Sequence, residues 1–112
     1  MKLKREEFLK QIEDCKVTSM TFDQRLLDNA AVMFENWGLQ AHETWAETDK
    51  EHLFMSHGLN DKSDDSEALK REKMALRCVA SKIMKTQISK GDAVGIMKNL
   101  NDINKPGFRW LQ

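Results

Sequence analysis

Residues 66–87, SEALKREKMALRCVASKIMKTQ, form the stretch that decides the fold. Their apolar side chains recur every three or four positions, which is the period of an amphipathic α-helix. Asp65 or Ser66 caps the predicted helix, and Glu67 suits its positive first turn. At 1.5 Å per residue such a helix is about 30 Å long, enough to cross a small domain. Its predicted inward face consists of Leu69, Leu76, Val79, Ala80, Ile83 and Met84.

The same period recurs on both sides of this helix, in a chain with one proline, five glycines and little strand-like alternation. It predicts helices over residues 3–16, from near Thr21 to Gly38, over residues 40–57, and from Ser89 onward. Gly38 either separates two helices or lies within one bent helix over residues 22–57. The polar stretch LNDKSDD, residues 59–65, is the predicted loop and the best candidate for local mobility.

The length of 112 residues fits one hydrophobic core, because two cores would each be short of buried area. We therefore predict an all-α fold, a single compact bundle of four to five helices over residues 1–104. A short extended tail over residues 105–112 follows it, since Pro106 cannot continue a helix.

The two cysteines, Cys15 and Cys78, lie in predicted helices and lack the spacing of a redox or zinc motif. We interpret them as free, small apolar packing residues in a reduced, cytoplasmic setting. The N-terminus has no apolar stretch of the kind that export signals carry. The longest apolar run, AAVMF at residues 30–34, is far below the roughly 18 residues that span a bilayer. We expect the protein to be neither exported nor membrane-spanning.

The sequence also argues against metal and enzyme sites. His42, His52 and His57 lie in an acidic region, but on one helix they would be too far apart or turned too far from one another to share a metal ion. The glycines fit no phosphate-binding loop, and neither cysteine has a histidine partner that the sequence can identify. We therefore predict no catalytic residues, no cofactor, no metal and no enzymatic activity.

One arc of the long helix is rich in positive charge. Lys70, Arg71, Arg77, Lys82 and Lys85 lie opposite the apolar face, and Met74, Cys78 and Ser81 lie among them. An ordinary solvated helix face explains the bases alone. Met74 and Cys78 in the same arc favour apolar contact with a further surface.

The charge distribution along the chain suggests what the basic arc contacts. Net charge is zero, but residues 23–65 carry ten acids and three bases, and residues 66–112 carry ten bases and four acids. The basic arc therefore suits an acidic surface. This surface is either the chain's own segment from Glu43 to Glu51, packed in the same subunit or in a second copy, or a patch on another protein. We rank a protein partner first, with self-association expected. The alternative is a nucleic-acid-binding module that uses the same arc, although a chain without net positive charge is unusual for one.

The C-terminal stretch KPGFRWLQ, residues 105–112, allows two interpretations. Phe108, Trp110 and Leu111 could fold back on the core, since aromatic rings bury a large area. Alternatively Phe108, Arg109 and Trp110 dock a partner, because Trp and Arg are enriched at interface hot spots. The sequence thus predicts a small non-enzymatic regulator or inhibitor that binds protein. Compact chains of this kind are common in phages and mobile elements, which suggests that this chain comes from one of them.

Overall fold

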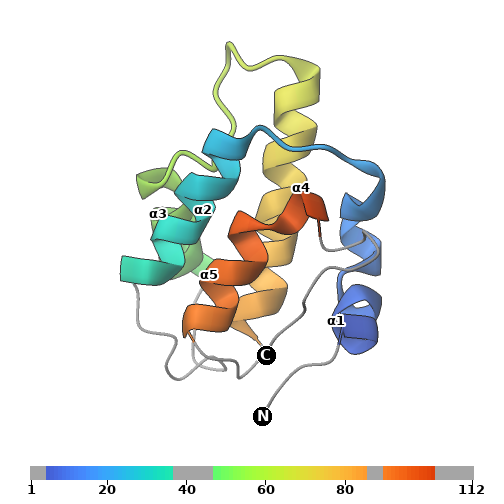
Figure 1. The fold of residues 1–112 in the computed structure, drawn as a ribbon. Coiled ribbons are helices and arrows are strands. Elements are labelled where there is room, and N and C mark those ends of the chain that lie inside the picture. The colour runs from blue at the N-terminus through green and yellow to red at the C-terminus, as the bar shows by residue number, and fades with distance from the viewer. Residues whose placement is uncertain (1–4, 37–46, 86–89, 103–112) are drawn as a thin grey trace.

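The structure, a computed structural model, describes residues 5–36, 47–85 and 90–102 (Figure 1). The all-α fold class is confirmed, since these ranges contain helices and turns and no strand. None of the helices described is long and apolar enough to cross a bilayer. The α-helices are α1 (Arg5–Gln11), α2 (Gln24–Asn36), α3 (Glu47–Ser56), α4 (Glu67–Met84) and α5 (Lys90–Lys98), and the 3₁₀ turns are η1 (Glu13–Cys15), η2 (Val17–Ser19) and η4 (Leu100–Asp102).

The helices enclose one core. Helix α5 packs against α2, and α4 contacts α2 on one side and η1 on another (Figure 1). Each of these elements contributes buried apolar side chains, and burial of that area is the main force that holds the bundle together. The largest fully buried side chains are Phe8, Ile12, Leu27, Met33, Phe34, Leu59, Leu76, Ile83, Met84, Ile96 and Met97.

Helix α4 begins where the sequence predicts. The Ser66 hydroxyl accepts a hydrogen bond from the Leu69 backbone N–H at 3.1 Å, which satisfies one of the unpaired donors of the first turn. The predicted inward face is buried from Leu76 to Met84, and Leu69 is partly buried. The last predicted turn, residues 86–87, lies outside the described residues.

The N-terminal helix is shorter than predicted. Instead of one helix over residues 3–16, α1 ends at Gln11 and two 3₁₀ turns follow. Lys16, between these turns, has φ 59°, a left-handed conformation in which the chain changes direction directly after Cys15. The apolar spacing was nevertheless informative, because Phe8, Ile12 and Cys15 are all buried.

Helix α2 starts later than predicted, because Asp23 rather than Thr21 accepts the hydrogen bonds of its first turn. The Asp23 carboxylate accepts from the Arg25 N–H at 2.9 Å, and its carbonyl accepts from the Leu26 N–H at 3.0 Å. The preceding residue is fixed by Asn101 of η4, whose side chain accepts from the Phe22 N–H at 2.8 Å and donates to the Phe22 carbonyl at 3.0 Å. These paired bonds join the start of α2 to the end of the described chain.

Helix α3 ends near Gly58, as predicted. Gly58 has φ +71°, a conformation that suits glycine, and the Leu59 N–H donates to the Phe54 carbonyl at 2.9 Å. Phe54 of this helix is buried in the core, whereas His52 is exposed. Gly38 lies outside the described residues, so the choice between one bent helix and two helices concerns residues that the structure does not describe.

Candidate functional site

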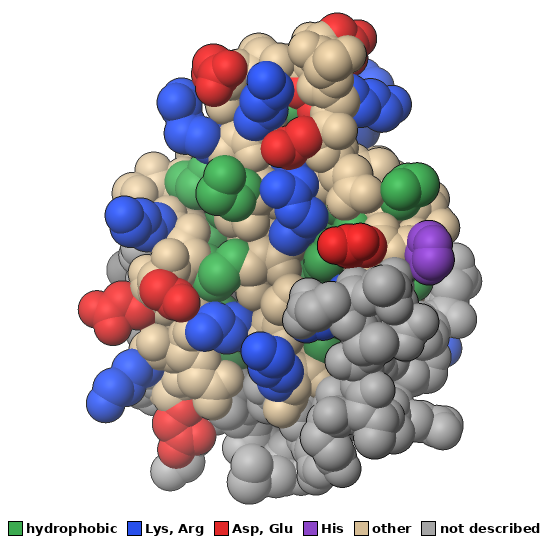
Figure 2. Space-filling model, turned by 180° about the vertical axis from the view of Figure 1, so that it is seen from behind, with side chains coloured by type: hydrophobic (Ala, Val, Ile, Leu, Met, Phe, Trp, Pro, Cys, Tyr) green, Lys and Arg blue, Asp and Glu red, His purple; other side chains and the backbone are tan. Residues whose placement is uncertain are grey.

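The basic arc predicted on α4 lies on the face seen from behind in Figure 2, where Lys and Arg side chains follow one another from top to bottom. Most of its charges have a partner within the chain. Lys70 lies 3.6 Å from a Glu67 carboxylate oxygen, and Lys82 lies 3.4 Å from an Asp14 carboxylate oxygen. Arg71 and Lys85 are exposed and make no ion pair with a described residue. The arc is therefore less positive than the sequence alone indicates.

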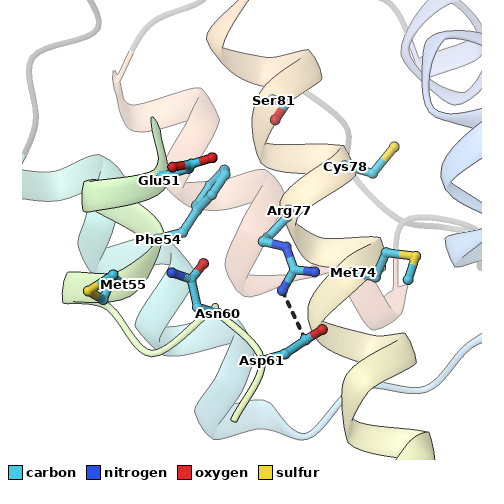
Figure 3. A pocket seen from close by; sticks show the side chains of 9 residues that line it. All are labelled: Glu51, Phe54, Met55, Asn60, Asp61, Met74, Arg77, Cys78 and Ser81. Atoms are coloured by element: carbon cyan, nitrogen blue, oxygen red, sulfur yellow. Dashed lines mark hydrogen bonds and ion pairs between the residues drawn. The ribbon is translucent and has the colours of Figure 1, made fainter. Parts of the chain in front are cut away.

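Arg77 fixes the predicted mobile loop to α4. Its guanidinium donates to the Leu59 carbonyl at 2.6 Å and to an Asp61 carboxylate oxygen at 3.2 Å (Figure 3). Leu59 itself is fully buried. The loop is thus attached by a charge-assisted hydrogen bond, an ion pair and an apolar anchor, which together restrain its backbone.

Lys73 attaches the same loop one turn earlier. It is buried, and its ammonium lies 2.6 Å from an Asp65 carboxylate oxygen and 3.1 Å from the Asn60 carbonyl. The hydrogen bond from Lys73 lowers the pKa of the Asp65 carboxyl below its usual range, and a backbone N–H of Lys62 acts in the same direction. Sequence reasoning missed this pair, because a lysine in a helix usually marks a solvated face.

Between the loop, α3 and α4 lies a hollow of about 630 Å³, which we name the Arg77 hollow (Figure 3). Met55 and Met74 line it and are 63% and 60% exposed, the largest exposed fractions among the bulky apolar side chains that the structure describes. Arg77 points into the hollow from α4, whereas Met74 and Cys78 project from the other side of that helix (Figure 3). Its lining residues are Glu51, Phe54, Met55, Asn60, Asp61, Met74, Arg77, Cys78 and Ser81.

A second hollow, of about 500 Å³, lies on the other side of Met74 between α4 and the 3₁₀ turns η1 and η2. We name it the disulfide hollow, because both cysteines line it. Lys16 and Arg71 are its cations without an ion pair to a described residue, while Asp14 is paired with Lys82. It is lined by Asp14, Cys15, Lys16, Ser19, Met20, Arg71, Met74, Ala75 and Cys78.

The expectation of free cysteines is wrong, since Cys15 and Cys78 form a disulfide with Cα atoms 5.6 Å apart. The two residues are 63 positions apart, so only packing of η1 on α4 brings them together. Cys15 is 7% exposed and Cys78 is half-buried. The sequence shows only that the chain has two cysteines. Two cysteines form one disulfide or none, and their spacing in the sequence does not decide between these two possibilities.

Potential metal ligands also meet at this point. Among the described residues, Asp14, Cys15 and Cys78 are the group whose ligand atoms lie within 4.8 Å of one another. The histidines are elsewhere: His52 is exposed and His57 is half-buried, and His42 lies outside the described residues. The predicted tail residues Phe108, Arg109 and Trp110 lie outside them as well.

Searches for similar proteins do not extend these observations. No protein-family model, no curated protein and no solved structure matches this chain.

Proposed function

We propose that this chain is a small non-enzymatic regulator or inhibitor that binds another protein through the exposed side of α4. The observation that carries the proposal is Met74. This flexible apolar side chain is 60% exposed and lines both the Arg77 hollow and the disulfide hollow. Methionine adapts its shape to a partner and is frequent at protein-binding surfaces. The exposed guanidinium of Arg71, one helical turn away, suits a carboxylate on that partner.

The pattern of ion pairs favours a protein partner over nucleic acid. Phosphate binding depends on cations that neutralise the backbone, and Lys70, Arg77 and Lys82 already face carboxylates of this chain. A surface that mixes exposed methionines with both signs of charge is typical of protein interfaces. Nucleic-acid binding through the same arc remains the alternative hypothesis.

Three further features belong to the proposal. The tail residues Phe108, Arg109 and Trp110 either extend the binding surface or cover the core. The cytoplasmic setting and a phage or mobile-element provenance are also retained as hypotheses. In a cytoplasm most disulfides are reduced, so the dithiol form of Cys15 and Cys78 would be populated there.

The test is quantitative affinity capture from the native host with three versions of the full chain. Arg71→Glu with Met74→Glu reverses charge and adds a carboxylate at two exposed positions, and neither side chain holds the loop. Val32→Glu is the matched control, because Val32 is an exposed apolar residue on α2. We expect a specific protein that wild type and the control retain and the double variant loses. Equal recovery by all three versions would contradict the proposed surface.

Two solution measurements test the alternatives. Submicromolar binding to DNA or RNA that falls steeply with salt would replace the proposal by the nucleic-acid hypothesis. For self-association, sedimentation of wild type is compared with Lys82→Glu combined with Lys85→Glu. A monomer in both cases would exclude a second copy as the partner.

A further inference from the structure

The Cys15–Cys78 disulfide lies beside charged side chains. The Asp14 carboxylate lies beside it: one oxygen, Oδ1, is 3.9 Å from the Cys15 Sγ, and the other, Oδ2, is 3.4 Å from the Lys82 ammonium. The three potential ligand atoms of Asp14, Cys15 and Cys78 lie within 4.8 Å of one another. Two sulfurs and one carboxylate oxygen thus converge although the residues come from two separate segments.

Charged residues surround the cysteine pair. Lys16 and Arg71 line the same hollow as both cysteines, and Lys82 faces Asp14. The thiolate is the form of cysteine that binds metal ions, so binding displaces the thiol protons. Cys78 is half-buried and lines both hollows.

From this geometry we infer that the reduced pair is a binding site for a thiophilic divalent cation of the Zn²⁺ type. Reduction by two molecules of a small thiol such as glutathione converts Cys15–S–S–Cys78 into two cysteine thiols and the thiol into its own disulfide. Metal binding then releases the two thiol protons, and the Cys15 and Cys78 sulfurs with Asp14 Oδ1 become ligands. Glutathione disulfide oxidises the two thiolates back to the disulfide and is itself reduced to two glutathione thiolates, which removes both sulfur ligands and expels the cation.

The change between the two forms is small. Two zinc–sulfur bonds of about 2.3 Å in tetrahedral geometry place the sulfurs about 3.8 Å apart, against about 2.05 Å in a disulfide. Each sulfur therefore moves by about 0.9 Å, which side-chain rotation can supply with the backbone in place. Asp14 can keep Lys82 on Oδ2 while Oδ1 binds the cation, an arrangement that orients a ligand. Water completes the fourth position.

The two forms are thus alternative cross-links between the same segments, η1 and α4. The disulfide joins them under oxidising conditions, and the metal joins them under reducing conditions. In both forms η1, which forms one wall of the disulfide hollow, stays attached to α4. This inference does not rest on the proposed protein-binding function, because its ligands, its probe and its readouts are different.

The experiment uses the full chain, reduced and then freed of reductant without oxygen. Co²⁺ is the spectroscopic probe, because thiolate–cobalt charge-transfer absorption reports sulfur ligation, and Zn²⁺ is then used to displace it. We expect one equivalent of Co²⁺ with thiolate bands, complete displacement by Zn²⁺, and no such binding by the oxidised chain. The oxidised wild type is the decisive control, because it has the same sequence and the fold described here.

Variants assign the ligands. We expect Cys15→Ser and Cys78→Ser to lose the thiolate bands or weaken Zn²⁺ binding by more than roughly 100-fold, and Asp14→Asn to weaken it at least about tenfold. Glu13→Gln is the matched control for charge, since Glu13 is the adjacent exposed acid, and it should change affinity less than about twofold. Zn²⁺ should also slow oxidation of the dithiol by glutathione disulfide. The inference is overturned if the reduced chain binds no stoichiometric metal, if the serine variants bind equally well, or if bound Zn²⁺ leaves the oxidation rate unchanged.

Discussion

The Cys15–Cys78 disulfide leads to a stability difference that can be worked out from the chain. The bond joins residues 63 positions apart, and the chain-entropy model relates the length of the closed loop to the entropy lost by the unfolded chain. For such a loop the model gives about 14 cal/mol/K, or about 4 kcal/mol at 25 °C. Reduction of the bond is expected to remove about 2–4 kcal/mol, because measured values usually fall at or below the model value.

The corresponding shift in Tm follows from the length of the chain. At about 2.1 cal/mol/K per residue, 112 residues give an unfolding entropy of about 0.24 kcal/mol/K. A loss of 2–4 kcal/mol therefore lowers Tm by about 8–17 °C. We do not expect reduction to unfold the chain, because Phe8, Ile12 and Val17 hold the N-terminal segment in the core independently of the bond.

The measurement is thermal unfolding of the same wild-type protein, oxidised and reduced, followed by circular dichroism with chelator present. Mass spectrometry of the oxidised sample, with alkylation before digestion, establishes that the bond is formed. Cys15→Ser with Cys78→Ser is the second variant, and its Tm should not respond to reductant. The reasoning fails if the oxidised sample contains two free thiols, or if an intact bond gives the same Tm as the reduced protein.

Three smaller predictions concern α4 and the loop before it. Asp65→Asn should lower the free energy of unfolding at pH 7. The difference from wild type should shrink as pH falls below about 4, because a carboxyl group with a lowered pKa contributes stability that is lost when the group is protonated. Urea unfolding from pH 7 to pH 2 measures this difference. Ser66→Ala should cost about 1 kcal/mol through loss of the cap to Leu69, and an unchanged urea midpoint would contradict that role. Gly58→Ala should lower stability by about 1 kcal/mol, because a residue with a Cβ is strained at the φ of +71°, even though nothing lies within 4 Å of the added atom. Gly58→Asn should lower stability less in the same assay, because asparagine tolerates this conformation better.

Much of the fold could be predicted because it depends on local patterns. Apolar residues at helical spacing placed α2, α4 and α5, and the Ser66 cap needed only the type of residue before a helix. The errors arose where tertiary contacts override local preference. The 3–16 segment has helical spacing, yet its chain turns at Lys16 so that η1 lies against α4.

The candidate site was harder to predict, because it depends on which side chains meet across the fold. Lys73 looks like a solvated base in the sequence, and only the position of Asp65 explains why it is buried. Cys15 and Cys78 are similarly unremarkable until η1 packs on α4. The spacing of apolar residues identifies the apolar face of one helix. It does not show which other segment of the chain packs against that helix.

Contacts with neighbouring segments anchor two stripes of polar and charged residues on α4, and this arrangement bears on the binding surface that we propose. Lys73 and Arg77, four positions apart, hold the loop over residues 59–65 and are engaged by it. Cys78 and Lys82, also four apart, hold the N-terminal segment. Met74 lies between these anchored stripes, and Arg71 lies about two turns before Cys78 in line with the second stripe; both side chains are exposed. Because the anchors restrain both walls, a partner that contacts these two side chains meets a surface that is already ordered, which lowers the entropic cost of binding. Substitution of these two residues can therefore separate binding from folding, whereas substitution of Arg77 or Lys73 would disturb both.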